Sequence, residues 1–281
     1  MLRHKKHFVT LVCLVVGMLV LTTAVYANYD DAKGYTNYKD SLKHLLFEAD
    51  NYTLNYQAKI KMDDEMIQTL IGNEKLAGKN RSHYEKSGDS SDEKSRVYDY
   101  YTFTEGNKYY SYYPETNTYY EGKISSDRSG SLMGSDDATV KKAVRFTELL
   151  ADTLIGDLKN NVILESSKDG VKEYSIHVSG NQIPEIVNAG LSLAFTASNS
   201  EDYENDVTSK FGNEPYIDNV NMRVTLDEKG RLINNELEAS LVGIDQNGKK
   251  HKGTMEVTVD ITDYESTKAD VFDPEGKVKE N

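Results

Sequence analysis

Apolar and polar residues alternate strictly along three consecutive stretches between residues 220 and 263. Alternation with a period of two is typical of a strand that buries one face and exposes the other. Residues 227–230 and 245–248 separate the stretches, and both contain the Asp, Asn and Gly residues of tight turns. The pattern predicts three antiparallel strands, with these apolar positions: Val220, Met222, Val224 and Leu226; Leu237, Ala239 and Leu241; Met255, Val257, Val259 and Ile261.

The N-terminal half predicts a helix followed by more of the same sheet. Residues 35–48 carry one apolar stripe with helical spacing, formed by Tyr38, Leu42, Leu45 and Leu46. Residues 54–62 and 66–76 then alternate around a turn at Asp63-Asp64, and residues 81–86 continue the sheet less regularly. The segment 97–124 predicts three further short strands.

The same segment, 97–124, is rich in tyrosine. Adjacent tyrosines in a strand place one ring on each face of the sheet. One interpretation is a stacking surface for a ligand. The other, which strand propensity favours, is that tyrosine simply fits a half-buried pleat.

Two broad apolar helices are predicted in the middle of the chain, at residues 136–158 and 183–197, with a hairpin around Asp169-Gly170 between them. After Asp263 the periodicity is lost and a polar tail is expected. The order of elements, with strands joined by short turns, predicts an α+β fold in one domain spanning residues 28–281. A sheet of about nine or ten strands tends to curl, so we expect a half-barrel with the apolar helices packed on its concave face.

The first 27 residues predict an export signal. Arg3, Lys5 and Lys6 precede an almost wholly apolar run at residues 8–25. Cleavage before Asn28 fits the small residues there, whereas the length of the run also suits an uncleaved membrane anchor. Both alternatives place the rest of the chain outside the cytoplasm, either secreted or anchored to the membrane by the N-terminal segment.

Charge and cysteine content narrow the class further. Cys13, inside the apolar run, is the only cysteine, so the exported part holds together without disulfides. The formal net charge of -13, with no basic stripe, argues against nucleic-acid binding.

No constellation for catalysis is apparent. The six histidines are scattered without zinc-ligand spacing, and neither a nucleophile elbow nor a phosphate-binding glycine loop is present. We therefore expect no catalytic residues, no metal site and no cofactor, and a protein that is not an enzyme.

The predicted order of elements, together with the segments 136–158, 183–197 and 227–230, resembles the half-barrel of bacterial lipoprotein carriers of the LolA type and their mycobacterial LppX-like and LprG-like relatives. Residues 180–184 and 243–251 also resemble uncharacterised exported proteins of Gram-positive bacteria, a group that implies no function. The carrier resemblance implies a lipid or other apolar ligand held between sheet and helices. The chain departs from that type in lacking a lipobox.

Two functions follow as hypotheses. The first is a binding protein for a lipid or apolar small molecule. The second is a cell-envelope module that senses or contacts another protein, with the membrane involved only through the N-terminal segment. Under the first, the residues expected to line the ligand site are apolar helix positions, although the same residues would equally form an ordinary core: Phe146, Leu150, Leu154, Val187, Leu191 and Phe195.

Overall fold

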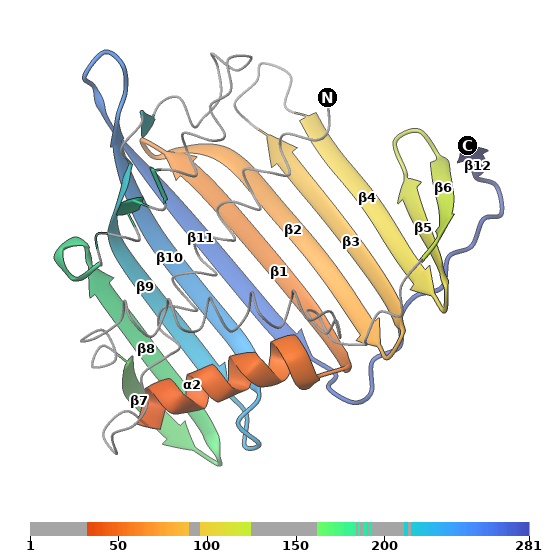
Figure 1. The fold of residues 1–281 in the computed structure, drawn as a ribbon, viewed down its shortest axis with the longest axis horizontal. Coiled ribbons are helices and arrows are strands. Elements are labelled where there is room, and N and C mark those ends of the chain that lie inside the picture. Colours follow the sequence, from red (N-terminus) through yellow and green to blue (C-terminus); the bar gives the residue numbers. More distant parts are fainter. Residues whose placement is uncertain are drawn as a thin grey trace.

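The computed structural model describes residues 33–89, 96–124, 162–183, 211–212 and 215–280, together with residues 185, 188, 189, 191 and 192. Twelve strands in these ranges form one sheet that does not close on itself (Figure 1). All neighbouring strands pair antiparallel except the last pair along one edge. The predicted α+β fold with a large, curled, antiparallel sheet is confirmed, with twelve strands where nine or ten were expected and with one parallel pair at the edge.

The elements follow the chain in simple order, and most strands pair with their sequence neighbours. Across the sheet the order is β12-β6-β5-β4-β3-β2-β1-β11-β10-β9-β8-β7, so β1 and β11 meet near the middle. The bounds are α2 Lys33–Lys43, the π-helical turn η2 His44–Glu48, β1 Asn51–Met62, β2 Glu65–Ala77, β3 Asn80–Asp89, β4 Arg96–Glu105, β5 Lys108–Tyr113, β6 Thr118–Lys123, β7 Val162–Lys168, β8 Val171–Ser179, the 3-10 turn η4 Gly180–Gln182, β9 Tyr216–Leu226, β10 Leu232–Ile244, β11 Lys250–Thr262 and β12 Val278–Glu280.

One helix, α2, covers part of one face of the sheet. Helix α2 lies across β7, β9 and β10 at one end of the strands (Figure 1). Tyr38, on the predicted apolar stripe, is fully buried; its hydroxyl lies 3.5 Å from the sulfur of Met222 and accepts a hydrogen bond from the Asn235 amide at 3.1 Å. We call the sheet face that α2 covers the inner face, and the opposite one the outer face.

The core lies between α2 and the inner face of β8 to β1. Residues directly opposite in paired strands lie on the same face, and the register places the alternating apolar positions of the three C-terminal strands together there. Ile183 and Leu191, from the second predicted helix, are buried in this core. The described residues of that segment dock onto β9, because the Asn188 side chain accepts a hydrogen bond from the backbone N–H of Ile217.

The C-terminal segment, residues 263–280, does not trail away from the sheet. It leaves β11, crosses the outer face, and ends as β12, which pairs in parallel with β6 (Figure 1). The Asn51 side chain bonds the backbone of Thr267 at both its N–H and C=O groups, and Ser82 donates to and accepts from Asp270. The predicted polar tail is thus bound along its length.

Most predicted strands and turns are confirmed, including the Asp63-Asp64 turn, where both residues have positive φ. The predicted helix at 136–158 and the N-terminal run at 8–25 lie outside the described residues. In the part of the chain that is described, no helix has the length and apolar character needed to cross a membrane.

Candidate functional site

Near the middle of the sheet, the described residues leave part of the inner face uncovered. Central strands usually bury their apolar face most completely. Here, five inner-face apolar side chains of β1 and β11 are only half-buried: Leu54, Ala58, Ile60, Val257 and Val259. Ala58 is directly opposite Val257, whereas Leu54 and Ile60 are opposite the buried Ile261 and Met255, and Val259 is opposite Tyr56. We call the five half-buried residues the apolar strip, which the described part of the chain leaves partly open.

Polar side chains continue the same inner face across β2, β3 and β4. The register places Leu54, Glu74 and His83 in one row across β1, β2 and β3. The next row brings Tyr56 and Glu85 to Tyr100. We call the following residues the inner polar cluster: Tyr52, Tyr56, Glu74, Arg81, His83, Glu85 and Tyr100.

Glu74 is the buried centre of this cluster. Glu74 is 5% exposed, and its Oε2 accepts a hydrogen bond from Arg81 Nη2 at 2.6 Å. His83 Nδ1 lies 3.8 Å from the same oxygen. The other carboxylate oxygen, Oε1, is buried without a hydrogen-bond partner within the described structure, and so is the hydroxyl of Tyr52. Leaving such a group unsatisfied costs about 1–3 kcal/mol, and more when it is charged.

The aromatic members surround the second carboxylate. Tyr56 donates a hydrogen bond to Glu85 at 3.0 Å, and its ring stacks on His83 with a centroid distance of 6.3 Å. Tyr100 lies 5.7 Å from His83, centroid to centroid. Burial, followed by the nearby Glu85 charge, raises the pKa of both Tyr56 and Tyr100 well above the ordinary value. Both phenols therefore remain neutral hydrogen-bonding groups.

Glycine at position 72 makes room for one of these rings. A Cβ atom there would lie 2.0 Å from Cζ of Tyr56, so only glycine lets the ring lie across β2 towards Glu85. The position of the Tyr56 ring therefore depends on the glycine at residue 72 of the neighbouring strand β2.

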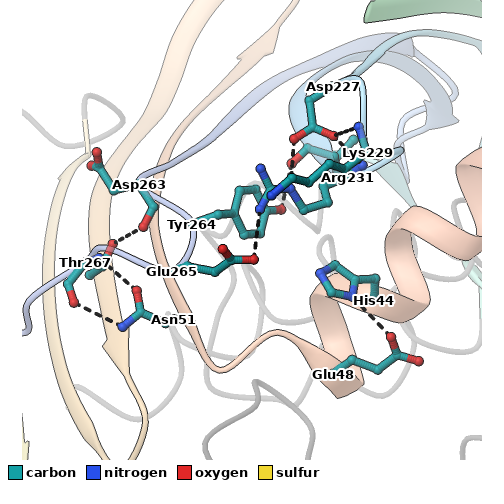
Figure 2. A network of polar contacts seen from close by, with 11 residues as sticks. His44, Glu48, Asn51, Asp227, Lys229, Arg231, Asp263, Tyr264, Glu265 and Thr267 are labelled. Atoms are coloured by element: carbon teal, nitrogen blue, oxygen red, sulfur yellow. Dashed lines mark hydrogen bonds and ion pairs between the residues drawn. The ribbon is translucent and has the colours of Figure 1, made fainter. Parts of the chain in front are cut away.

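A second polar network lies at the end of the sheet where α2 ends (Figure 2). Asp227 accepts hydrogen bonds from two backbone N–H groups of its own turn and pairs with the Arg231 guanidinium at 2.8 Å. That guanidinium lies 4.4 Å from the centroid of the Tyr264 ring, and Tyr264 donates to the Leu232 carbonyl at 2.7 Å. Each polar group satisfies another within the chain, so this network fixes the C-terminal segment rather than offering a site.

The outer face of the tyrosine-rich strands is also occupied by the chain itself. Phe272, 7% exposed, lies 4.8–6.2 Å, centroid to centroid, from four outer-face rings. These are Phe103, Tyr110, Tyr112 and Tyr119. The outer tyrosines thus form a packed aromatic cluster, as the interpretation from strand propensity predicts.

One buried histidine, His251, links two turns of the sheet. It is 6% exposed and lies between two aspartates, 2.7 Å from Asp63 and 3.3 Å from Asp245. Both carboxylates also accept backbone N–H groups, which lower their pKa values. The triad joins the β1–β2 turn to the β10–β11 turn. Within the described ranges, no group of three or more His, Cys, Asp or Glu side chains is placed to hold a metal ion.

Of the ligand-lining residues predicted from sequence, the structure describes one. Leu191 is 2% exposed and belongs to the same core as Ile183. Phe146, Leu150, Leu154, Val187 and Phe195 lie outside the described residues. Leu191 is compatible with either a ligand contact or ordinary core packing, and the lining set remains a prediction.

The inner polar cluster was not predicted from the sequence, although one signal was present. In β2, Glu74 occupies an inward position between Gly72 and Leu76, where the alternation calls for an apolar residue. A charge at such a position marks either a buried pair or a site. Its partners come from β1, β3 and β4, so only the register identifies them.

Comparison with solved structures finds neighbours that share little sequence with this chain. LprF from Mycobacterium bovis matches with a TM-score of 0.31 and 8% identity over 81% of this chain and 90% of that one. A LolA superfamily protein from Nitrosomonas europaea matches with a TM-score of 0.20 and 12% identity over 83% and 92%. No family model and no curated protein matches the chain.

Proposed function

We propose that this protein is an extracytoplasmic, non-enzymatic binding protein that holds an apolar ligand, such as the chain of a lipid, against the centre of its inner face. One observation carries the proposal: the apolar strip on β1 and β11 is half-buried in the middle of a twelve-stranded sheet. Contact with an apolar ligand would remove this area from water, which stabilises by about 25 cal/mol for each Å² buried.

The position of the strip supports a ligand in preference to a partner protein. It lies on the face that α2 and Leu191 also cover, between the core and the inner polar cluster. On the outer face of β5 and β6, Tyr110, Tyr112 and Tyr119 contact Phe272, so the chain itself covers these tyrosines. Export, which the first 27 residues predict, would place such a protein where envelope lipids are available.

The first test is native mass spectrometry of the form that a bacterial host exports when given the full chain, followed by organic extraction. A co-purifying lipid mass supports the proposal and identifies the ligand class. A clean mass that fatty acids and phospholipids leave unchanged contradicts it. The mass of the N-terminal peptide also shows whether residues 1–27 are removed.

A pair of neighbouring variants locates the ligand. Val257→Trp adds a large apolar side chain to the half-buried strip, so we expect it to displace the ligand while the fold is kept. Thr258→Trp places the same side chain on the outer face of the same strand and should leave binding unchanged. Equal binding by both variants in a ligand titration, with both folded, would argue against the strip as the site.

A further inference from the structure

We propose that the inner polar cluster recognises a cationic, amine-bearing head group of the bound amphiphile, with Glu74 Oε1 and the Tyr52 hydroxyl as its hydrogen-bond partners. This inference rests on the proposed function, because the apolar strip would hold the tail of the same molecule. Leu54 joins the two surfaces: it belongs to the strip and is directly opposite Glu74.

The charge of the cluster selects the class of head group. Glu74 and Glu85 supply two carboxylates, and Arg81 supplies the one permanent cation. The cluster therefore carries an excess negative charge, and the chain as a whole has a formal charge of -13. An anionic head such as a phosphate or carboxylate would face two carboxylates, whereas a cation would be attracted.

The buried oxygen of Glu74 that lacks a partner among the described residues requires a hydrogen-bond donor from the ligand. Arg81 occupies Oε2 of Glu74 and leaves Oε1 without a partner in the described structure. A carboxylate oxygen accepts only, so its missing partner must be an N–H or O–H group. A primary ammonium carries three such donors, and hydrogen bonds between charged groups are the strong ones. The Tyr52 hydroxyl, fully buried and also unpaired, can accept a second of them.

The rings of the cluster pack on one another beside the carboxylates. Tyr56 stacks on His83 with a centroid distance of 6.3 Å, and Tyr100 lies 5.7 Å from the same ring, centroid to centroid. Arg81, with 37% of its side chain exposed, is the member of the Glu74 pair that borders solvent, so a head group would approach past it.

The test compares three amphiphiles with the same dodecyl tail: dodecylammonium, dodecanoate and dodecyl maltoside, each titrated below its micelle concentration into the exported protein. We expect dodecylammonium to bind at least about tenfold more tightly than dodecanoate, which corresponds to one charged hydrogen bond. Glu74→Gln should remove this preference. Glu238→Gln, which changes the net charge equally at an exposed position of β10, should keep it.

Each outcome has a distinct meaning. Equal binding of all three amphiphiles would overturn head-group recognition and leave the proposed function standing, whereas no binding of any would contradict both. Tighter binding of the maltoside would identify a hydroxylated head and overturn the cationic one. Equal loss of affinity in the two Gln variants would show a non-specific charge effect.

A second variant covers the case in which Glu74→Gln fails to fold. Tyr52→Phe removes only a buried hydroxyl that has no hydrogen-bond partner among the described residues, so the fold should be kept. We expect dodecylammonium affinity to fall at least about tenfold, as for one hydrogen bond to a charged group. An unchanged affinity would overturn the assignment of the Tyr52 hydroxyl and, with it, the proposed head-group site.

Discussion

Phe272 provides the sharpest test of how the C-terminal segment is held. It is 7% exposed, and its ring contacts four aromatic rings from β4, β5 and β6. Replacing a buried phenylalanine with alanine typically costs about 3–5 kcal/mol. Phe272→Ala should therefore lower the free energy of unfolding by about 3 kcal/mol, the lower end, since the segment can shift to fill part of the space.

The assay is thermal unfolding of the exported protein followed by limited proteolysis. For a domain of this size, 1 kcal/mol changes Tm by about 2–4 °C, so a decrease of roughly 6–12 °C is expected. If the segment detaches locally, the residues after Asp263 should also become sensitive to protease well below the melting temperature, because β12 contributes only three paired residues.

The matched control is the adjacent residue. Val271 lies in the same segment but is 72% exposed, so Val271→Ala should change the free energy of unfolding by less than about 0.5 kcal/mol. A melting temperature and a protease pattern that are the same for the two variants would refute the reasoning. The C-terminal segment would then be attached by its hydrogen bonds alone.

Two further substitutions test other parts of the fold. Gly72→Ala should lower the free energy of unfolding by about 1–3 kcal/mol, because the new Cβ occupies the place of the Tyr56 ring. Combining it with Tyr56→Ala should relieve the clash, so the double variant should lose less stability than the sum of the two single variants. Additive losses in denaturant melts would contradict this explanation. The pKa of Asp63 is lowered mainly by the backbone N–H of Lys252, so its contribution to stability is present above the ordinary pKa of 3.8 and is lost as the pH falls through the lower folded value. In the Asp63→Asn variant, Tm should therefore decrease less steeply than in the parent protein as the pH falls below about 4. If Tm depends on pH in the same way in both proteins, protonation of Asp63 is not coupled to unfolding.

The sequence by itself determined most of the strands and their connections, with β12 as the exception. Alternation with period two identified β9, β10 and β11, because a strand with one buried face must place apolar residues at every second position. Turn residues located the hairpins for the same local reason. The stripe containing Tyr38 and Leu42 predicted α2, although not the strands on which it lies.

Only the tertiary structure decided which residues share a site. The inner polar cluster joins side chains of four strands, and a position such as Glu74 is recognisable in the sequence only as a break in the pattern. The C-terminal segment has no periodicity, since its single buried aromatic side chain, Phe272, packs on rings from strands more than 150 residues earlier in the chain. Such contacts depend on strand register and on non-local packing, and the spacing of apolar residues along the chain predicts neither of them.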